Sequence, residues 1–107
     1  MPTTTDTPRR YPRRKAPKGL CVVWQTASRR SASYVETMGM GGLFIRTKEP
    51  VAVGTMIRLL VDLPSGEVRG RAIVRSVKVG EGMGVGIVSM NPEDRSRLNH
   101  FLGKLPA

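Results

Sequence analysis

Hydrophobic and polar residues alternate along much of the chain, and this period of two predicts β-strands. The alternation is clearest at 55–63, where aliphatic residues occupy alternate positions. A longer strand is expected at 67–79, with Arg69, Arg71 and Arg75 on one of its faces. Shorter strands are expected at 20–24, 34–37, 42–47 and 83–90.

The segments between and within these strands carry turn residues. The polar stretch at 26–33 predicts a hairpin loop. The glycine-rich segment "MGMGG" at 38–42 predicts a tight turn or a close approach of two backbones. Gly84 and Gly86, inside the last strand, indicate a bulge or a bend.

Only the C-terminal segment has the pattern of a helix, which we expect at 91–103. Asn91 is a good N-cap residue, and Pro92 suits the first helical position. Leu98 and Leu102 begin an apolar stripe with helical spacing. Because no helix is predicted between the strands, the sheet is expected to be antiparallel. Five or six short strands around one core favour a small closed barrel flanked by this helix.

The composition adds a strong local charge to this all-β picture. The chain has 107 residues, enough for one domain, and a formal net charge of +10. Residues 9–30 hold eight Lys and Arg residues and no Asp or Glu. Such a segment attracts phosphate-bearing partners, although a solubilising tail is the alternative interpretation. Residues 1–8 are expected to be disordered, and prolines keep 9–18 extended.

The residue types that catalysis requires are scarce. His100 is the only histidine, and it is expected on the exposed side of the helix. Cys21 is the only cysteine, and its place in a predicted strand favours a packed thiol over a nucleophile. No carboxylates have metal-ligand spacing, so we expect no enzyme activity, metal or cofactor. The lone cysteine and the lack of a long apolar run favour a cytoplasmic protein without membrane insertion.

Three segments, in this order, resemble the PilZ domain family. They are "RRYPR" at 9–13, "GGLFI" at 41–45 and "GMGVGIVSMNPEDRSRLNHFL" at 82–102. The resemblance extends over about residues 9–103. It implies a six-stranded antiparallel β-barrel with a C-terminal helix. It also implies a receptor for the bacterial second messenger cyclic di-GMP (c-di-GMP).

The family's first motif, R-x-x-x-R, is intact. It matches Arg9 and Arg13, and a second register matches Arg10 and Arg14. In the family these arginines contact the phosphates and the guanine faces of the dinucleotide. A guanidinium group suits this role because its fork donates bidentately to phosphate and to the edge of guanine.

The family's second motif, D/N-x-S-x-x-G, is only partly present. Thr37 takes the place of the acid or amide, Gly39 that of the serine, and Gly42 keeps the glycine. A register one residue earlier puts Glu36 at the acidic position but Met38 in place of the serine. The residues expected to contact c-di-GMP are Arg9, Arg10, Arg13, Arg14, Thr37, Gly39, Gly41 and Gly42.

Two functional hypotheses follow from this pattern, and a third is less favoured. In the first, c-di-GMP orders the basic segment against the glycine turn, whose amides supply an anion-binding nest, and the new surface meets a protein partner. In the second, a degenerate PilZ protein binds no nucleotide and regulates pili or motility through protein contacts. The third is charge-driven nucleic-acid binding, disfavoured because the aromatic residues that could stack on bases are scattered. The expected organisation is a tail at 1–8 and a PilZ domain at 9–107, with the basic segment at 9–18, the barrel at 19–90 and the helix at 91–103.

Overall fold

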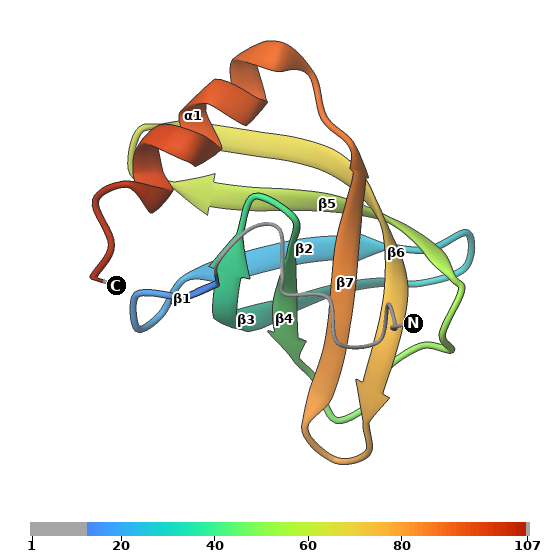
Figure 1. Ribbon diagram of the computed structural model, residues 1–107. Helices are drawn as coiled ribbons and strands as arrows, with labels where there is room; N and C mark the ends of the chain where they lie inside the picture. Colours follow the sequence, from blue (N-terminus) through green and yellow to red (C-terminus); the bar gives the residue numbers. More distant parts are fainter. Residues whose placement is uncertain (1–12, 107) are drawn as a thin grey trace, which may run out of the picture.

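The computed structural model describes residues 13–106 (Figure 1). The expected tail at 1–8, and Arg9 and Arg10, lie outside the described residues. The elements are β1 (Arg14–Lys15), β2 (Cys21–Gln25), β3 (Arg30–Gly39), β4 (Gly42–Arg46), β5 (Met56–Leu63), β6 (Gly66–Lys78), β7 (Gly82–Ser89) and α1 (Pro92–Leu102).

Six of the strands form a closed antiparallel barrel. Their order is β3-β2-β5-β6-β7-β4, and the pairing of β4 with β3 closes the ring. The two-residue strand β1 adds to β3 outside this ring. The helix α1 lies over one end of the barrel, beside β5 and β6 (Figure 1). The predicted six-stranded barrel with one C-terminal helix is therefore confirmed.

Inward-facing aliphatic residues fill the barrel. The four aliphatic residues that alternate along β5 are all buried, as the sequence pattern predicted. Trp24 is the largest buried side chain, with 0% exposure, and its indole Nε1 donates to Ser33 Oγ at 3.0 Å. Leu98 and Leu102 of the helix close the core at one end.

The helix is fastened to the barrel at its first turn. Asn91 is the N-cap, and its side chain accepts a hydrogen bond from Asp94 N at 2.8 Å. Asp94 is buried, and its carboxylate accepts from the backbone amide of Arg69 in β6 at 3.0 Å. It also pairs with Arg97 at 3.1 Å. The predicted helix start is confirmed, and its acidic residue also holds the helix on β6.

The predicted hairpin loop at 26–33 is wrong in its length. The chain turns at Thr26–Arg29, where Thr26 N donates to Arg29 O at 2.8 Å, and β3 begins at Arg30. Ser31 and Ser33 occupy inward positions at which the pattern of the other strands has aliphatic residues. The hydroxyl of Ser33 satisfies the indole of Trp24, so this polar stretch is strand and not loop.

The predicted packing of Cys21 is also wrong. Val22 and Trp24 both point into the core with 0% exposure, so the period of two turns Cys21 outward. Its thiol is exposed and donates to the Gly19 carbonyl at a distance of 3.5 Å.

A bulge is present opposite the glycines of the last strand, although its extra residue, Arg75, belongs to β6. The β6–β7 register shifts between Val74 and Ser76, opposite Gly84. A Cβ at Gly84 would lie only 2.6 Å from Ser76 Oγ, so the bulged strand packs directly on this glycine.

Candidate functional site

Strand β1 joins the end of the basic segment to the strand that carries the second motif. Arg14 pairs with Met38, and Lys15 pairs with Thr37. Continuing this register by one residue sets Arg13 opposite Gly39. Strand β1 lies beside β3 (Figure 1), so the last arginine of R-x-x-x-R, which directly precedes β1, is a neighbour of the first half of the glycine-turn motif.

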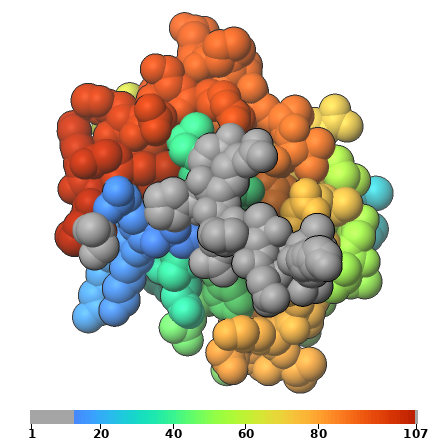
Figure 2. Space-filling model, in the orientation of Figure 1, coloured from blue at the N-terminus to red at the C-terminus, as the bar shows by residue number. Residues whose placement is uncertain are grey.

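The direction of the side chains distinguishes the two arginine registers. Met38 has 0% exposure and faces the core, so Arg14 directly opposite it lies on the inner side. Arg14 Nη1 donates to the Leu105 carbonyl at 3.5 Å. The start of the described chain accordingly lies against the C-terminal segment (Figure 2). By alternation, Arg13 shares the outer face with Thr37, which favours the register that uses Arg13.

The outer surface beside Thr37 carries an aromatic ring and a cation. Thr37 pairs with Phe44 after a β-bulge that follows Val35. Lys78 Nζ lies 5.7 Å from the centre of the Phe44 ring. A Cβ at Gly82 would be 2.9 Å from that ring, so the ring lies directly on the backbone of β7. A flat aromatic face of this kind can stack on a purine base.

The glycine turn is shaped by close packing between strands. Gly39 pairs with Gly42, and Met40 and Gly41 form the two-residue connection. A Cβ at Gly42 would lie 2.0 Å from the carbonyl oxygen of Val85 in β7. The backbones of β4 and β7 are therefore so close here that only glycine fits at position 42. The close backbone approach predicted for this segment is therefore confirmed.

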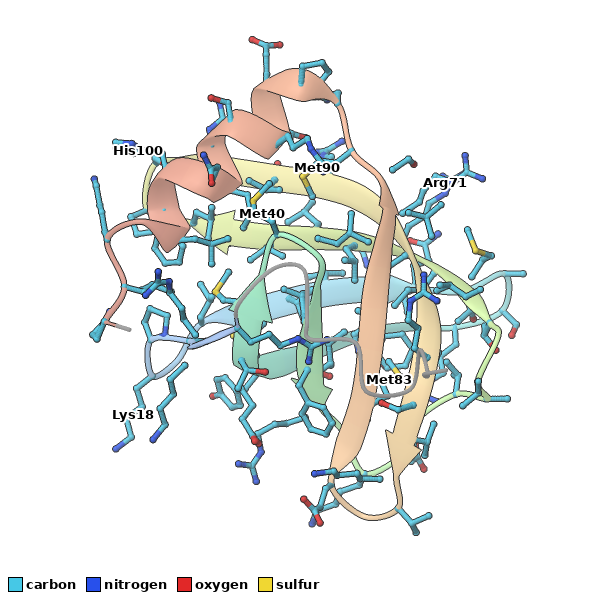
Figure 3. All side chains as sticks on the ribbon, viewed as in Figure 1. Lys18, Met40, Arg71, Met83, Met90 and His100 are labelled. Carbon is cyan, nitrogen blue, oxygen red and sulfur yellow. The ribbon has the colours of Figure 1, made fainter. Side chains whose placement is uncertain are left out.

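The anion-binding nest suggested for this turn stays a prediction. Positive φ among the described glycines is found elsewhere, at Gly19, Gly54, Gly66 and Gly80, so a nest here would rest on the turn conformation without a left-handed residue. The Gly41 carbonyl is engaged with β7, because it accepts from Ile87 N at 2.9 Å. Met40, at the tip of the hairpin, packs against the core below α1 (Figure 3).

A further cation lies next to the turn. A Cβ at Gly86 would be 2.2 Å from Arg75 Nε, so the Arg75 side chain lies flat across β7 at Gly86. Gly86 pairs with Gly42, which brings the Arg75 guanidinium beside the motif glycine. Sequence reasoning placed Arg75 on the same strand face as Arg69 and Arg71 but did not connect it, or Phe44, with the site. The connection depends on the β4–β7 register, which the sequence does not reveal.

Other kinds of site find little support in residues 13–106. Within this range no group of three or more His, Cys, Asp or Glu residues could hold a metal ion. His100 is exposed on α1, as predicted. The one helix of this range is too short and too polar to cross a membrane.

Comparisons with known proteins agree with this geometry. The family model described as "PilZ domain" matches residues 7–104. The structure titled PilZ domain with c-di-GMP of YcgR from Escherichia coli has a TM-score of 0.74 at 15% identity, and the match covers 91% of this chain and 90% of that one. Inhibitor of motility MotI/DgrA from Bacillus subtilis has a TM-score of 0.72 at 18% identity, with 92% of this chain and 53% of that one covered.

A third solved structure, the MrkH–c-di-GMP complex of K. pneumonia, has a TM-score of 0.71 at 15% identity, with 90% of this chain and 50% of that one covered. The chain thus spans about half the length of the MotI and MrkH chains. A search of curated proteins finds no match. At these identities the solved structures establish the fold, whereas the family model matches nearly the whole sequence. The chain therefore belongs to the PilZ domain family.

Proposed function

We propose that this chain is a c-di-GMP receptor module that binds the nucleotide on the outer wall formed by β1, β3, β4 and β7. The observation that carries the proposal is the pairing of β1 with β3, which brings Arg13 next to the strand of Thr37 and Gly39. Family membership supports it, and so do the titles of two solved relatives, the YcgR domain and MrkH, which name c-di-GMP.

The proposed roles follow from the chemistry of each side chain. Arg13, together with Arg9 outside the described residues, would donate to the phosphates and to the guanine edges. The Thr37 hydroxyl would replace one contact of the missing acid or amide. The Phe44 ring, with Arg75 on the neighbouring part of the wall, would stack on a base and add positive charge.

The departures from the second motif set an expected cost in affinity. A lost charge-assisted hydrogen bond costs roughly 1.5–3 kcal/mol, and a lost neutral one roughly 0.5–1.5 kcal/mol. Binding weaker by about two orders of magnitude than with both motif residues present is therefore expected. Ligand binding would hold the basic segment that precedes β1 against the end of β3 and the turn that follows it, and so create a new surface for a protein partner.

Gly39 favours a second candidate function, regulation through protein contacts without nucleotide. It is buried and has no hydroxyl to offer where the motif has serine. The double substitution Thr37→Asp plus Gly39→Ser separates the two candidates. If the wild-type chain binds no nucleotide and the double variant does, the protein-contact function is supported. If neither binds, the turn is not the limiting defect.

The test of the receptor function is calorimetric titration of the full chain with c-di-GMP, with GTP as the control ligand. We expect selective binding that Arg13→Ala weakens at least about tenfold. Arg95→Ala, which removes one exposed arginine from α1, is the matched control and should leave the affinity unchanged. Equal affinities for the Arg13 variant and the wild type would refute the proposed site. No binding heat from the folded wild type would favour the protein-contact function.

A further inference from the structure

A groove lined by four arginines crosses the wall of the barrel opposite the proposed nucleotide site. Its main cavity has a volume of about 600 Å³ and lies over β2, β5 and β6. A second cavity of about 340 Å³ shares Gln25, Arg58 and Arg71 with it, so the two form one groove. The four arginines of this arginine groove are Arg30, Arg58, Arg69 and Arg71.

The register of the sheet assembles these cations from distant parts of the sequence. Arg30 pairs with Gln25, Gln25 with Arg58, and Arg58 with Arg71, so one row of residues crosses four neighbouring strands. Adjacent strands lie about 4.8 Å apart. Arg71 lies on the other side of the barrel from Lys18, which follows β1 (Figure 3).

Folding alone does not explain this row of charges. Arg58 and Arg71 are directly opposite each other, and like charges in that position destabilise a sheet. Among the described residues, neither side chain forms a hydrogen bond or an ion pair, and no carboxylate lines either cavity. Arg69 has a partner, Glu67 at 3.2 Å, but both side chains are more than half exposed. An anionic ligand would relieve the repulsion between the two opposed guanidinium groups.

The floor of the groove indicates what kind of anion fits. Aliphatic and thioether side chains lie between the arginines, namely Val23, Leu60, Met56 and Met90. Arginine and methionine are enriched at protein interfaces, and methionine adapts to irregular surfaces. None of the described residues that line the groove is aromatic, so no platform is present there on which bases could stack.

We propose that the arginine groove binds an acidic, partly apolar segment of a partner protein. The carboxylates of the segment pair with Arg58 and Arg71, and its aliphatic residues cover Val23, Leu60 and Met90. The groove would be a second partner-binding surface of the proposed receptor, apart from the one that nucleotide binding is proposed to create at the basic segment. Its occupation does not depend on nucleotide binding, because it lies on a different wall of the barrel.

The test is fluorescence anisotropy with a labelled peptide of about a dozen residues in which Glu alternates with Leu and Ala. We expect binding to the full chain that weakens with added salt. The double variant Arg58→Gln plus Arg71→Gln should weaken it by about tenfold or more. The matched control, Lys18→Gln plus Lys48→Gln, removes the same charge from exposed positions outside the groove and should change binding by less than about twofold.

Two further measurements separate the loss of a groove contact from unfolding of the chain and from damage to the nucleotide site. The melting temperature of the Arg58/Arg71 variant should equal or exceed that of the wild type, because a repulsive pair is removed. Its affinity for c-di-GMP should be unchanged, so failure of the groove and failure of the nucleotide site are distinguishable. The proposal is overturned if wild type and groove variant bind the peptide equally, or if neither binds it. It is also overturned if oligothymidylate of similar charge binds the groove more tightly than the peptide.

Discussion

Replacement of Gly42 by alanine tests whether the motif glycine is required by the barrel itself. The added Cβ would lie 2.0 Å from the Val85 carbonyl oxygen and 3.2 Å from Gly86 Cα. Both obstacles are backbone atoms, so β4 and β7 must separate by about 1.5 Å to restore an ordinary contact. The separation would disrupt the first two pairs of the β4–β7 ladder, Gly42–Gly86 and Leu43–Val85.

The size of the effect follows from these contacts. About two ladder hydrogen bonds at roughly 0.5–1.5 kcal/mol each, plus overpacking of roughly 1–3 kcal/mol, give a destabilisation of roughly 2–6 kcal/mol. For a domain of this size the melting temperature should fall by roughly 10–25 °C. Thermal unfolding of the ligand-free chain, followed by circular dichroism, measures it.

Gly103→Ala is the matched control for this substitution. Gly103 has a φ of −63°, and an added Cβ would be 3.5 Å from its nearest neighbour outside the adjoining residues, the His100 carbonyl oxygen. The free energy of unfolding of the Gly103→Ala variant should stay the same or rise by about 0.4–1 kcal/mol. A Gly42→Ala variant that melts within a few degrees of the wild type would refute the packing argument. If that variant also lost c-di-GMP binding, the glycine would be required by the ligand instead.

Three other substitutions and treatments test separate parts of the structure. Asp94→Ala should lower the free energy of unfolding in urea by about 2–3 kcal/mol, because the Arg69 amide and the Arg97 guanidinium lose their acceptor. The control, Glu93→Ala at an exposed position, should cost much less. Cys21 should react with a maleimide in the native state as fast as an unstructured thiol, and reaction only after unfolding would contradict its outward position. Ser33→Ala should cost about 1–2 kcal/mol in thermal unfolding by leaving the Trp24 indole without its acceptor; an unchanged melting temperature would contradict that role.

The regular parts of the fold could be predicted because their local patterns agree with their final environment. The alternation in β5 corresponds to one buried and one exposed face. The N-cap at Asn91 is a local feature of the chain and needs no tertiary information. Both features are decided within a few residues, so sequence reasoning identified them.

The errors arose where a distant residue decides the local structure. Ser31 and Ser33 read as loop residues, but the indole of Trp24 in the neighbouring strand makes an inward hydroxyl favourable. Cys21 belongs to a run of apolar residues, and the pairing of β2 with β3 and β5 decides that Val22 and Trp24, rather than Cys21, face the core. Sequence patterns do not include such cross-strand partners.

The candidate site was only partly predictable for the same reason. The R-x-x-x-R motif is visible in the sequence, but β1 is two residues long and polar, so no pattern predicts that it pairs with β3. Arg75 joins the site only because the β6–β7 and β4–β7 registers carry its side chain to Gly86 beside Gly42. The arginine groove depends in the same way on register between strands that are distant in the sequence.

The most direct test of the central claim is nuclear magnetic resonance of the full chain titrated with c-di-GMP. The receptor account predicts that backbone amide signals of Lys15, Thr37 and Gly42 shift with ligand concentration, because these residues lie on the proposed wall. Signals of Arg58 and Arg71, on the opposite wall, should stay in place. Shifts confined to the arginine groove, or no shifts at all from the folded chain, would contradict the claim that the nucleotide binds between β1 and the glycine turn.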